Sequence, residues 1–293
     1  MKILNKILPP SNNNKWWKAY DGWRHTLILS DIHSGSIYAP WPEELDSIDG
    51  IRNKVDKERQ KFLNNKWREM EAWLPPRLDA VICNGDTLHG EEAKEGGKFC
   101  MTQQIKEQAD GARILLQGIR DRTSRMYLIT GTPYHEKDGG ELEFLGEVLG
   151  CERWNGDKFS GQVLQRNWQG IEINVSHHNT GYGMLASGSA DRLAMIAAAT
   201  ETIVKTTPAD VIIRGHMHMK RIVQVFNKWV VFCPAWQLIT PRVIKIREYY
   251  KASLFSDLGC IVMSIPNGEP SVYDIKFTCF DFKLPNRTRS ESL

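Results

Sequence analysis

The sequence predicts an α/β protein with mixed β-sheets. Short apolar runs alternate with helical segments through the first half of the chain, and this β-α-β-α-β order favours a parallel, buried sheet. Pairs of apolar runs separated by short polar turns follow in the second half, and they add antiparallel hairpins. The 293 residues are 41% hydrophobic and 25% charged, which is ordinary for a globular protein with a sizeable core.

Three strands and two helices are predicted in the first half. The apolar run Thr26 to Ser30 lacks polar alternation, as expected for a strand that is buried on both faces. Pro75-Pro76 stops the helical pattern that follows, because proline cannot continue a helix. In order, the expected elements are a strand at 26–30, a helix at 42–73, a strand at 80–83, a helix at 103–121 and a strand at 126–130.

The second half is predicted to be richer in strands. Ala-rich residues 186–205 have high helix propensity, and the apolar run 211–213 is a strand. A short helix is expected at 140–149, with hairpins at 161–166/171–176, at 222–226/229–233 around Asn227-Lys228, and at 259–265/271–282 around Asn267-Gly268. We expect one domain over 1–285 with a β-rich C-terminal part, and a disordered tail over 286–293.

Charge and cysteine content identify no partner. The formal net charge is +3, which is too small to demand a polyanion. The six cysteines are scattered without a Cys-x-x-Cys pair, which is typical of reduced core cysteines. The chain shows no signal-peptide pattern and no run of about 18 apolar residues. We therefore expect a soluble, cytoplasmic protein without a membrane partner.

Carboxylates and a histidine follow the first two predicted strands. Asp31 and His33 are two apart on extended backbone, so their side chains point the same way and can share an ion. Gly85-Asp86 ends the second strand, where glycine permits a sharp turn. Taken alone, each is more often a capping or turn carboxylate beside a surface histidine.

Further histidines follow the later strands. His135 lies in the turn after the third strand, His177-His178 follows a hairpin strand, and His216-Met217-His218 follows the run 211–213. A single histidine there is usually structural, but at least five of the chain's eight histidines lie at strand ends. Open α/β sheets place their sites at the carboxyl ends of strands. Carboxylates with imidazoles and no cysteine suit Mn²⁺, Fe, Zn²⁺, Co²⁺ or Ni²⁺.

The ordered motifs resemble a known family. Asp-x-His, Gly-Asp, Gly-x-x-x-His, His and Gly-His-x-His, between Ile28 and His218, are similar to the signature of the calcineurin-like metallophosphoesterases. The resemblance implies a four-layer αββα sandwich and a site for two divalent ions, Mn²⁺ being the first candidate, that hydrolyses a phosphate ester. No covalent enzyme intermediate is needed in such a mechanism.

The resemblance also implies roles for individual residues. Asp86 would bridge the two ions and His135 would be the general acid. The implied metal ligands are Asp31, His33, Asp86, His177, His216 and His218. His177 is preferred to His178 because it comes first after the strand.

The turn after the third strand departs from the family pattern. Thr132 replaces the asparagine ligand of the family, and Pro133-Tyr134 is inserted before His135. Thr132 is therefore a weak ligand or positions a water, or His135 itself becomes a ligand. His89, which follows the Gly-Asp motif, is expected only to line the pocket.

The substrate class is predicted less sharply than the chemistry. Basic and aromatic residues mix at 15–18, 220–226 and 242–251, which suits a nucleic-acid backbone but is more often solvated surface. We favour a phosphodiester, either a nucleotide or a nucleic acid. A phosphomonoesterase acting on protein or a small molecule is the alternative, and an inactive scaffold of the same fold is a third possibility. The sequence predicts no oligomeric state.

Overall fold

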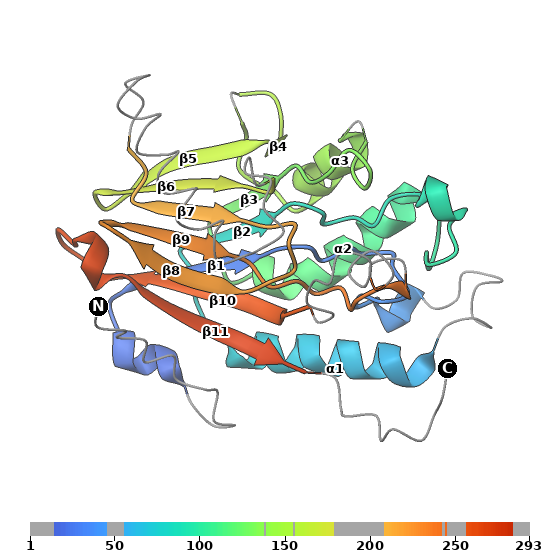
Figure 1. Ribbon diagram of the computed structural model, residues 1–293, viewed down its shortest axis with the longest axis horizontal. Coiled ribbons are helices and arrows are strands. Elements are labelled where there is room, and N and C mark those ends of the chain that lie inside the picture. The colour runs from blue at the N-terminus through green and yellow to red at the C-terminus, as the bar shows by residue number, and fades with distance from the viewer. Residues whose placement is uncertain are drawn as a thin grey trace.

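The protein contains two mixed β-sheets stacked face to face (Figure 1). The computed structural model describes residues 15–45, 56–137, 139–154, 156–178, 208–241, 244 and 256–283. The first sheet has the strand order β11-β10-β1-β2-β3-β4, and the second has the order β5-β6-β7-β9-β8. Antiparallel strands border the parallel strands on one side in the first sheet and on both sides in the second.

The first sheet carries a parallel set of four strands. Its members are β1 (Arg24–Leu29), β2 (Ala80–Asn84), β3 (Met126–Ile129), β4 (Ser160–Gly161), β10 (Leu258–Ile265) and β11 (Lys276–Phe282). Strands β1 to β4 run parallel, β10 pairs antiparallel with β1, and β11 pairs antiparallel with β10.

The second sheet is built around three parallel strands. Its members are β5 (Val163–Trp168), β6 (Ile171–Ser176), β7 (Val211–Arg214), β8 (Arg221–Val225) and β9 (Lys228–Phe232). Strands β6, β7 and β9 are parallel, whereas β5 and β8 pair antiparallel at the two edges.

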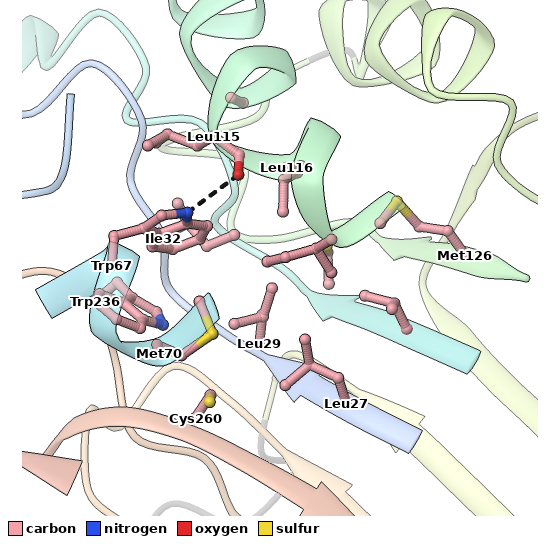
Figure 2. Packing of buried hydrophobic residues seen from close by; sticks show 14 of the residues in the cluster. Leu27, Leu29, Ile32, Trp67, Met70, Leu115, Leu116, Met126, Trp236 and Cys260 are labelled. Atoms are coloured by element: carbon pink, nitrogen blue, oxygen red, sulfur yellow. Dashed lines mark hydrogen bonds between the residues drawn. The ribbon is translucent and has the colours of Figure 1, made fainter. Parts of the chain in front are cut away.

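Three helices cover the outer face of the first sheet: α1 (Lys57–Trp73), α2 (Ile105–Arg120) and α3 (Gly140–Val148). Figure 1 shows α1 running alongside β11. The Asp56 side chain accepts a hydrogen bond from the Arg59 amide and so caps α1, as short polar side chains do at helix starts. Figure 2 shows the core beneath these helices, in which the Trp67 indole donates to the Leu115 carbonyl at 3.1 Å.

A second core lies between the sheets. Along β1, Leu27 and Leu29 face the helices, while Ile28 faces the other sheet. Side chains alternate along a strand, so a strand that is apolar on both faces must be covered on both. Along β6, Ile171, Ile173 and Val175 face this inter-sheet core. The two cores fix the sheets, and with them the ends of the strands.

Most predicted elements are confirmed, with corrections at three places. The helix expected at 42–73 begins at Lys57, after a separate 3-10 turn at Glu43–Leu45. The hairpin turn is Phe226-Asn227 instead of Asn227-Lys228, because Lys228 already pairs with Val225. The last strand begins at Lys276 instead of Ser271, after a 3-10 turn at Val272–Asp274.

Some predictions lie outside the described residues, namely the helix at 186–205, the basic segment at 242–251 apart from Ile244, and the tail at 286–293. The described helices form one outer layer against two stacked sheets, which fits the predicted sandwich. All six cysteines lie within the described part, and each is buried with a free thiol. No helix among the described residues is long and apolar enough to cross a bilayer.

Candidate metal centre

The carboxyl ends of strands from both sheets converge at one end of the sandwich. Asp31 follows β1, Asp86 follows β2, and the Thr132 turn follows β3 in the first sheet. From the second sheet, His177 follows β6, and His216 and His218 follow β7. Backbone bonds join the loops, with the His33 amide donating to the Asp86 carbonyl at 2.9 Å and the Gly215 amide to the His177 carbonyl at 3.1 Å.

Two groups of three potential ligands lie there. Asp31, His33 and His218 form the first group, and their ligand atoms all lie within 4.8 Å of one another. The His218 Nε2 is 3.1 Å from the Asp31 Oδ1, and the His33 Nε2 is 3.9 Å from the same oxygen. This oxygen therefore lies at the centre of the first group.

Asp86, His177 and His216 form the second group, under the same 4.8 Å limit. The His177 Nε2 is 3.2 Å from the Asp86 Oδ2. This oxygen is also 4.0 Å from the His33 Nε2, which belongs to the first group. Asp86 thus lies between the two groups, where a bridging carboxylate is needed.

Five of these residues have left-handed backbone conformations that are unusual for residues other than glycine. They are Asp31 (φ 52°), His33 (φ 50°), Asp86 (φ 46°), His216 (φ 67°) and His218 (φ 51°). Such conformations cost about 1–3 kcal/mol each and concentrate at functional sites. This backbone geometry directs the side chains of the three loops toward one another.

Buried polar atoms at the centre lack hydrogen-bond partners among the described residues. They are the Asp31 Oδ1, both ring nitrogens of His33 and the Nε2 of His177. Leaving such atoms unpaired costs about 1–3 kcal/mol each, so native proteins rarely do so without a further ligand. Oxygen and nitrogen donors of this kind fit a divalent cation.

The charges at the centre also fit a cation. Burial raises the pKa of Asp86, but His177, His135 and His33 outweigh it, and this pKa lies well below its ordinary value. The pKa of Asp31 is also lowered, because the effect of His218 and His177 outweighs that of burial, which alone would raise it. Burial lowers the pKa of His177, yet Asp31 and Asp86 raise it to about 10. The carboxylates of Asp31 and Asp86 are therefore ionised, and their negative charge favours the binding of a cation.

Two neighbours hold Asp86 in position. The Thr132 amide donates to the Asp86 Oδ1 at 2.6 Å, and the Thr132 hydroxyl lies 3.0 Å from the same oxygen. Buried Glu136 accepts from the amides of Thr87 (2.7 Å), Leu88 (3.2 Å) and Gly131 (2.5 Å). Glu136 therefore ties the turn after β2 to the turn after β3.

His135 lies at the rim of the centre. Its Nδ1 contacts the His89 carbonyl oxygen, so a proton on Nδ1 is donated there, and its Nε2 lies 4.0 Å from the Asp86 Oδ2. Beside His135 is a cavity of about 200 Å³, whose lining combines Leu88 and Leu142 with charged side chains such as Glu91 and Lys137. Nε2 is thus presented to the centre, and the cavity lies next to the ring.

The remaining histidines occupy different places. His178 is exposed, with its ring centroid 5.5 Å from that of His216, and it is in neither ligand group. His89 is buried and forms a further group with His33 and His135. Burial first, then His135, lowers the pKa of His89 to about 3. The sequence predicts only a pocket-lining role for His89, whereas the structure also places it in a group of potential ligands with His33 and His135.

Three glycines make room for the ligands. A Cβ on Gly85 would lie 2.3 Å from the His177 ring, and one on Gly131 would lie 2.1 Å from the Asp86 Oδ1. A Cβ on Gly215 would lie 2.4 Å from the Ser30 hydroxyl oxygen and 2.7 Å from the His177 Nδ1. The backbone of each loop therefore approaches the ligand of another loop more closely than any side chain allows.

The structure brings together every residue that the sequence singles out, namely Asp31, His33, Asp86, Thr132, His135, His177, His216 and His218. Sequence reasoning missed Glu136 and Gln108. Glu136 follows His135 directly in the sequence, so its position beside the site was open to prediction. Gln108 lies within α2, where nothing in the local sequence marks it.

The sequence matches no model of a known protein family, and no curated protein matches it. Solved structures with a similar chain trace include Vps29 from Cryptosporidium parvum, at 11% identity over 90% of this chain and all of that one, with a TM-score of 0.46. Another is Vps29 from Entamoeba histolytica complexed with Zn²⁺, at 13% identity, 88% and 99% coverage, and a TM-score of 0.42.

A third similar structure is described as a novel archaeal phosphodiesterase. It is 10% identical, the match covers 88% of this chain and 99% of that one, and the TM-score is 0.42. At these values the similarity assigns no function to the chain. The interpretation of the site therefore depends on its own side chains.

Proposed function

We propose that the protein is a calcineurin-like metallophosphoesterase that hydrolyses a phosphate ester at a centre of two divalent ions. One observation carries the proposal: two groups of ligand side chains lie side by side, with Asp86 between them. The buried Asp31 Oδ1, His33 ring nitrogens and His177 Nε2, which make no hydrogen bond among the described residues, support it, because a cation in each group would contact the Asp31 oxygen, one His33 nitrogen and the His177 nitrogen.

Asp31, His33 and His218 would hold one ion, and His177 and His216 the other, with Asp86 bridging the two. His177 is oriented for this by its Nδ1, which lies 2.7 Å from the Asn84 carbonyl oxygen and leaves Nε2 for the ion. Such outer contacts of ligating histidines fix the ring and its tautomer. Mn²⁺ is our first choice for both positions, since the donors are carboxylates and imidazoles.

When bound, such an ion pair supplies Lewis-acid stabilisation of the phosphate charge and activates water at neutral pH. The chain's own residues do the rest. Thr132 and Glu136 keep Asp86 and its loop fixed. His135, held through Nδ1 by the His89 carbonyl, would donate a proton from Nε2 to the leaving oxygen.

We propose a phosphodiester as the substrate. Two lysines on described loops beside the site have carboxylate partners: Lys137 lies 2.5 Å from Glu91, and Lys220 contacts Asp281. A monoester dianion needs more positive charge than a diester monoanion, so this arrangement favours the diester.

The segment 15–18 takes no part in the proposal. Trp16 packs against His25 at the start of β1, whereas Asp31 follows the other end of that strand. An extended strand of this length separates its ends by roughly 20 Å.

The test is hydrolysis of bis-p-nitrophenyl phosphate and p-nitrophenyl phosphate by metal-stripped protein with added Mn²⁺. We expect turnover of the diester, and we expect His177→Ala to abolish it. His178→Ala is the matched control and should retain turnover, because His178 is exposed and outside both ligand groups.

Other outcomes would redirect the proposal. A preference for the monoester would identify a phosphomonoesterase with the same metal centre. Metal binding without turnover of either compound, and of DNA, RNA and cyclic nucleotides, would identify an inactive scaffold. Equal loss of turnover in the His178→Ala control would contradict the assignment of His177 as the ligand.

A further inference from the structure

A further cluster of metal-ligating side chains lies in the loop that follows β2. His89, Glu92 and Cys100 are 2%, 5% and 3% exposed, and their ligand atoms all lie within 4.8 Å of one another. None of the three belongs to the two groups around Asp86. The loop therefore brings an imidazole, a carboxylate and a thiol together in the protein interior.

One distance within the cluster is close to that between two ligands of one ion. The His89 Nε2 lies 3.8 Å from the Glu92 Oε1, which is too long for a hydrogen bond. Two ligands of a tetrahedral zinc ion at ordinary bond lengths are about 3.5 Å apart. The His89 Nε2 is buried and has no hydrogen-bond partner among the described residues. It points at the carboxylate without bonding to it.

We propose that His89, Glu92 and Cys100 bind a Zn²⁺ ion at a site separate from the two-metal centre. A nitrogen, an oxygen and a sulfur donor are a usual set for zinc, and three protein ligands leave a fourth position for water. The thiolate also distinguishes this site from the two-metal centre, whose ligand groups contain only aspartate and histidine. The inference does not depend on the phosphoesterase function.

Zinc binding here would exchange a proton for the metal. Burial, then Glu92, raises the pKa of the Cys100 thiol to about 12, so the thiol is protonated in the metal-free protein. Binding forms one sulfur–zinc bond, breaks the S–H bond and releases the proton to solvent. The Gln237 side-chain amide lies 3.3 Å from the His89 Nδ1, and zinc binding through Nε2 requires the amide oxygen to face this nitrogen, so that it accepts the Nδ1 proton.

The site would fix a loop that positions His135. The His89 carbonyl oxygen contacts the His135 Nδ1, and the same loop is held by Gln108, whose Oε1 accepts from the amides of His89 (3.0 Å) and Gly90 (2.8 Å). A metal on the His89 side chain would therefore stiffen the residue whose carbonyl orients His135. Its role would be to hold this loop in place, although the fourth position of the ion is left to water.

The first test is zinc content after saturation and removal of free metal. Wild-type protein should hold one more equivalent of Zn²⁺ than Cys100→Ser. Cys151→Ser is the matched control, since Cys151 is also a buried free cysteine but lies in no ligand group among the described residues. Asp86→Ala should keep the cysteine-dependent equivalent even if the two-metal centre is lost, so the two proposals fail separately.

The second test uses Co²⁺ in place of zinc. The cobalt protein should show a thiolate-to-cobalt charge-transfer absorption that is present in Cys151→Ser and absent in Cys100→Ser. If Cys100→Ser does not fold, wild-type protein still provides the test, because Zn²⁺ should slow alkylation of Cys100 at least tenfold and leave Cys151 unchanged. Equal zinc contents, or an alkylation rate of Cys100 unaffected by Zn²⁺, would overturn the proposal.

Discussion

Gly131→Ala tests how tightly the turn after β3 is built around Asp86. An added Cβ would lie 2.1 Å from the Asp86 Oδ1 and 2.2 Å from the Asp86 amide nitrogen. These separations are more than an ångström shorter than the 3.4 Å at which contact becomes ordinary. One of the two atoms is backbone, so rotating the side chain cannot relieve both contacts.

The expected effect follows from that overlap. Overpacking of this kind costs about 1–3 kcal/mol of unfolding free energy. A displacement of about 1 Å in a group that positions the reaction costs about 10²-fold in turnover. We therefore expect Gly131→Ala to fold with reduced stability, to bind metal more weakly and to lose about 10²-fold in kcat on bis-p-nitrophenyl phosphate.

The assay compares three readouts in one set of proteins: urea unfolding, bound Mn²⁺ and kcat. Gly140→Ala is the matched control, since a Cβ there would meet nothing within 4 Å among the described residues. Alanine at that position in α3 should be neutral or slightly stabilising. Wild-type metal content and kcat in Gly131→Ala would refute the claim that this backbone holds Asp86.

Three further predictions concern the same centre. Thr132→Val removes the hydroxyl that lies 3.0 Å from the Asp86 Oδ1 and should weaken Mn²⁺ binding about 10–100-fold in a calorimetric titration; an unchanged Kd would show that the amide alone suffices. His135→Gln should lower kcat about 10²–10⁴-fold on a diester with an alkyl leaving group, while the metal content stays full. On p-nitrophenyl esters the decrease in kcat should be smaller. A loss of bound metal would instead make His135 a ligand. Asp31 and Asp86 raise the pKa of His177 to about 10 against the effect of burial, so a metal must displace a proton from His177 near neutral pH. The affinity for Mn²⁺ should therefore rise about tenfold per pH unit near neutrality. A Kd that does not depend on pH would contradict this.

The central strands of the fold are predictable because their sequences carry a simple signal. Thr26 to Ser30 and Ala80 to Cys83 are apolar without alternation, and the structure buries both faces of β1 and β2. Turn positions are less predictable. Phe226 adopts a left-handed backbone conformation that its residue type does not favour. The sequence therefore indicates Asn227-Lys228, a more typical turn pair, in place of the actual turn Phe226-Asn227.

The juxtaposition of the site residues is predictable from the rule that parallel strands end at one edge of a sheet. The sequence does not show that two sheets bring their ends together, which places His177 and His218 beside Asp31. The sequence also gives no indication of the hydrogen bonds that hold the loops around the site. Gln108 lies in α2 and bonds to the loop around Gly90, a pairing set by tertiary packing and not by any local pattern.

The most direct test of the two-metal centre is turnover of bis-p-nitrophenyl phosphate as Mn²⁺ is added stepwise to metal-stripped protein, with Asp86→Ala beside the wild type. The Asp86 Oδ2 lies within 4.0 Å of histidine nitrogens from both ligand groups, and in the proposed arrangement Asp86 bridges the ions, so its loss should disable both positions. The account predicts that wild-type turnover saturates near two equivalents of metal and that Asp86→Ala shows none. Turnover that is unaffected by Asp86→Ala, or two bound equivalents with no turnover of any phosphate ester, would contradict it.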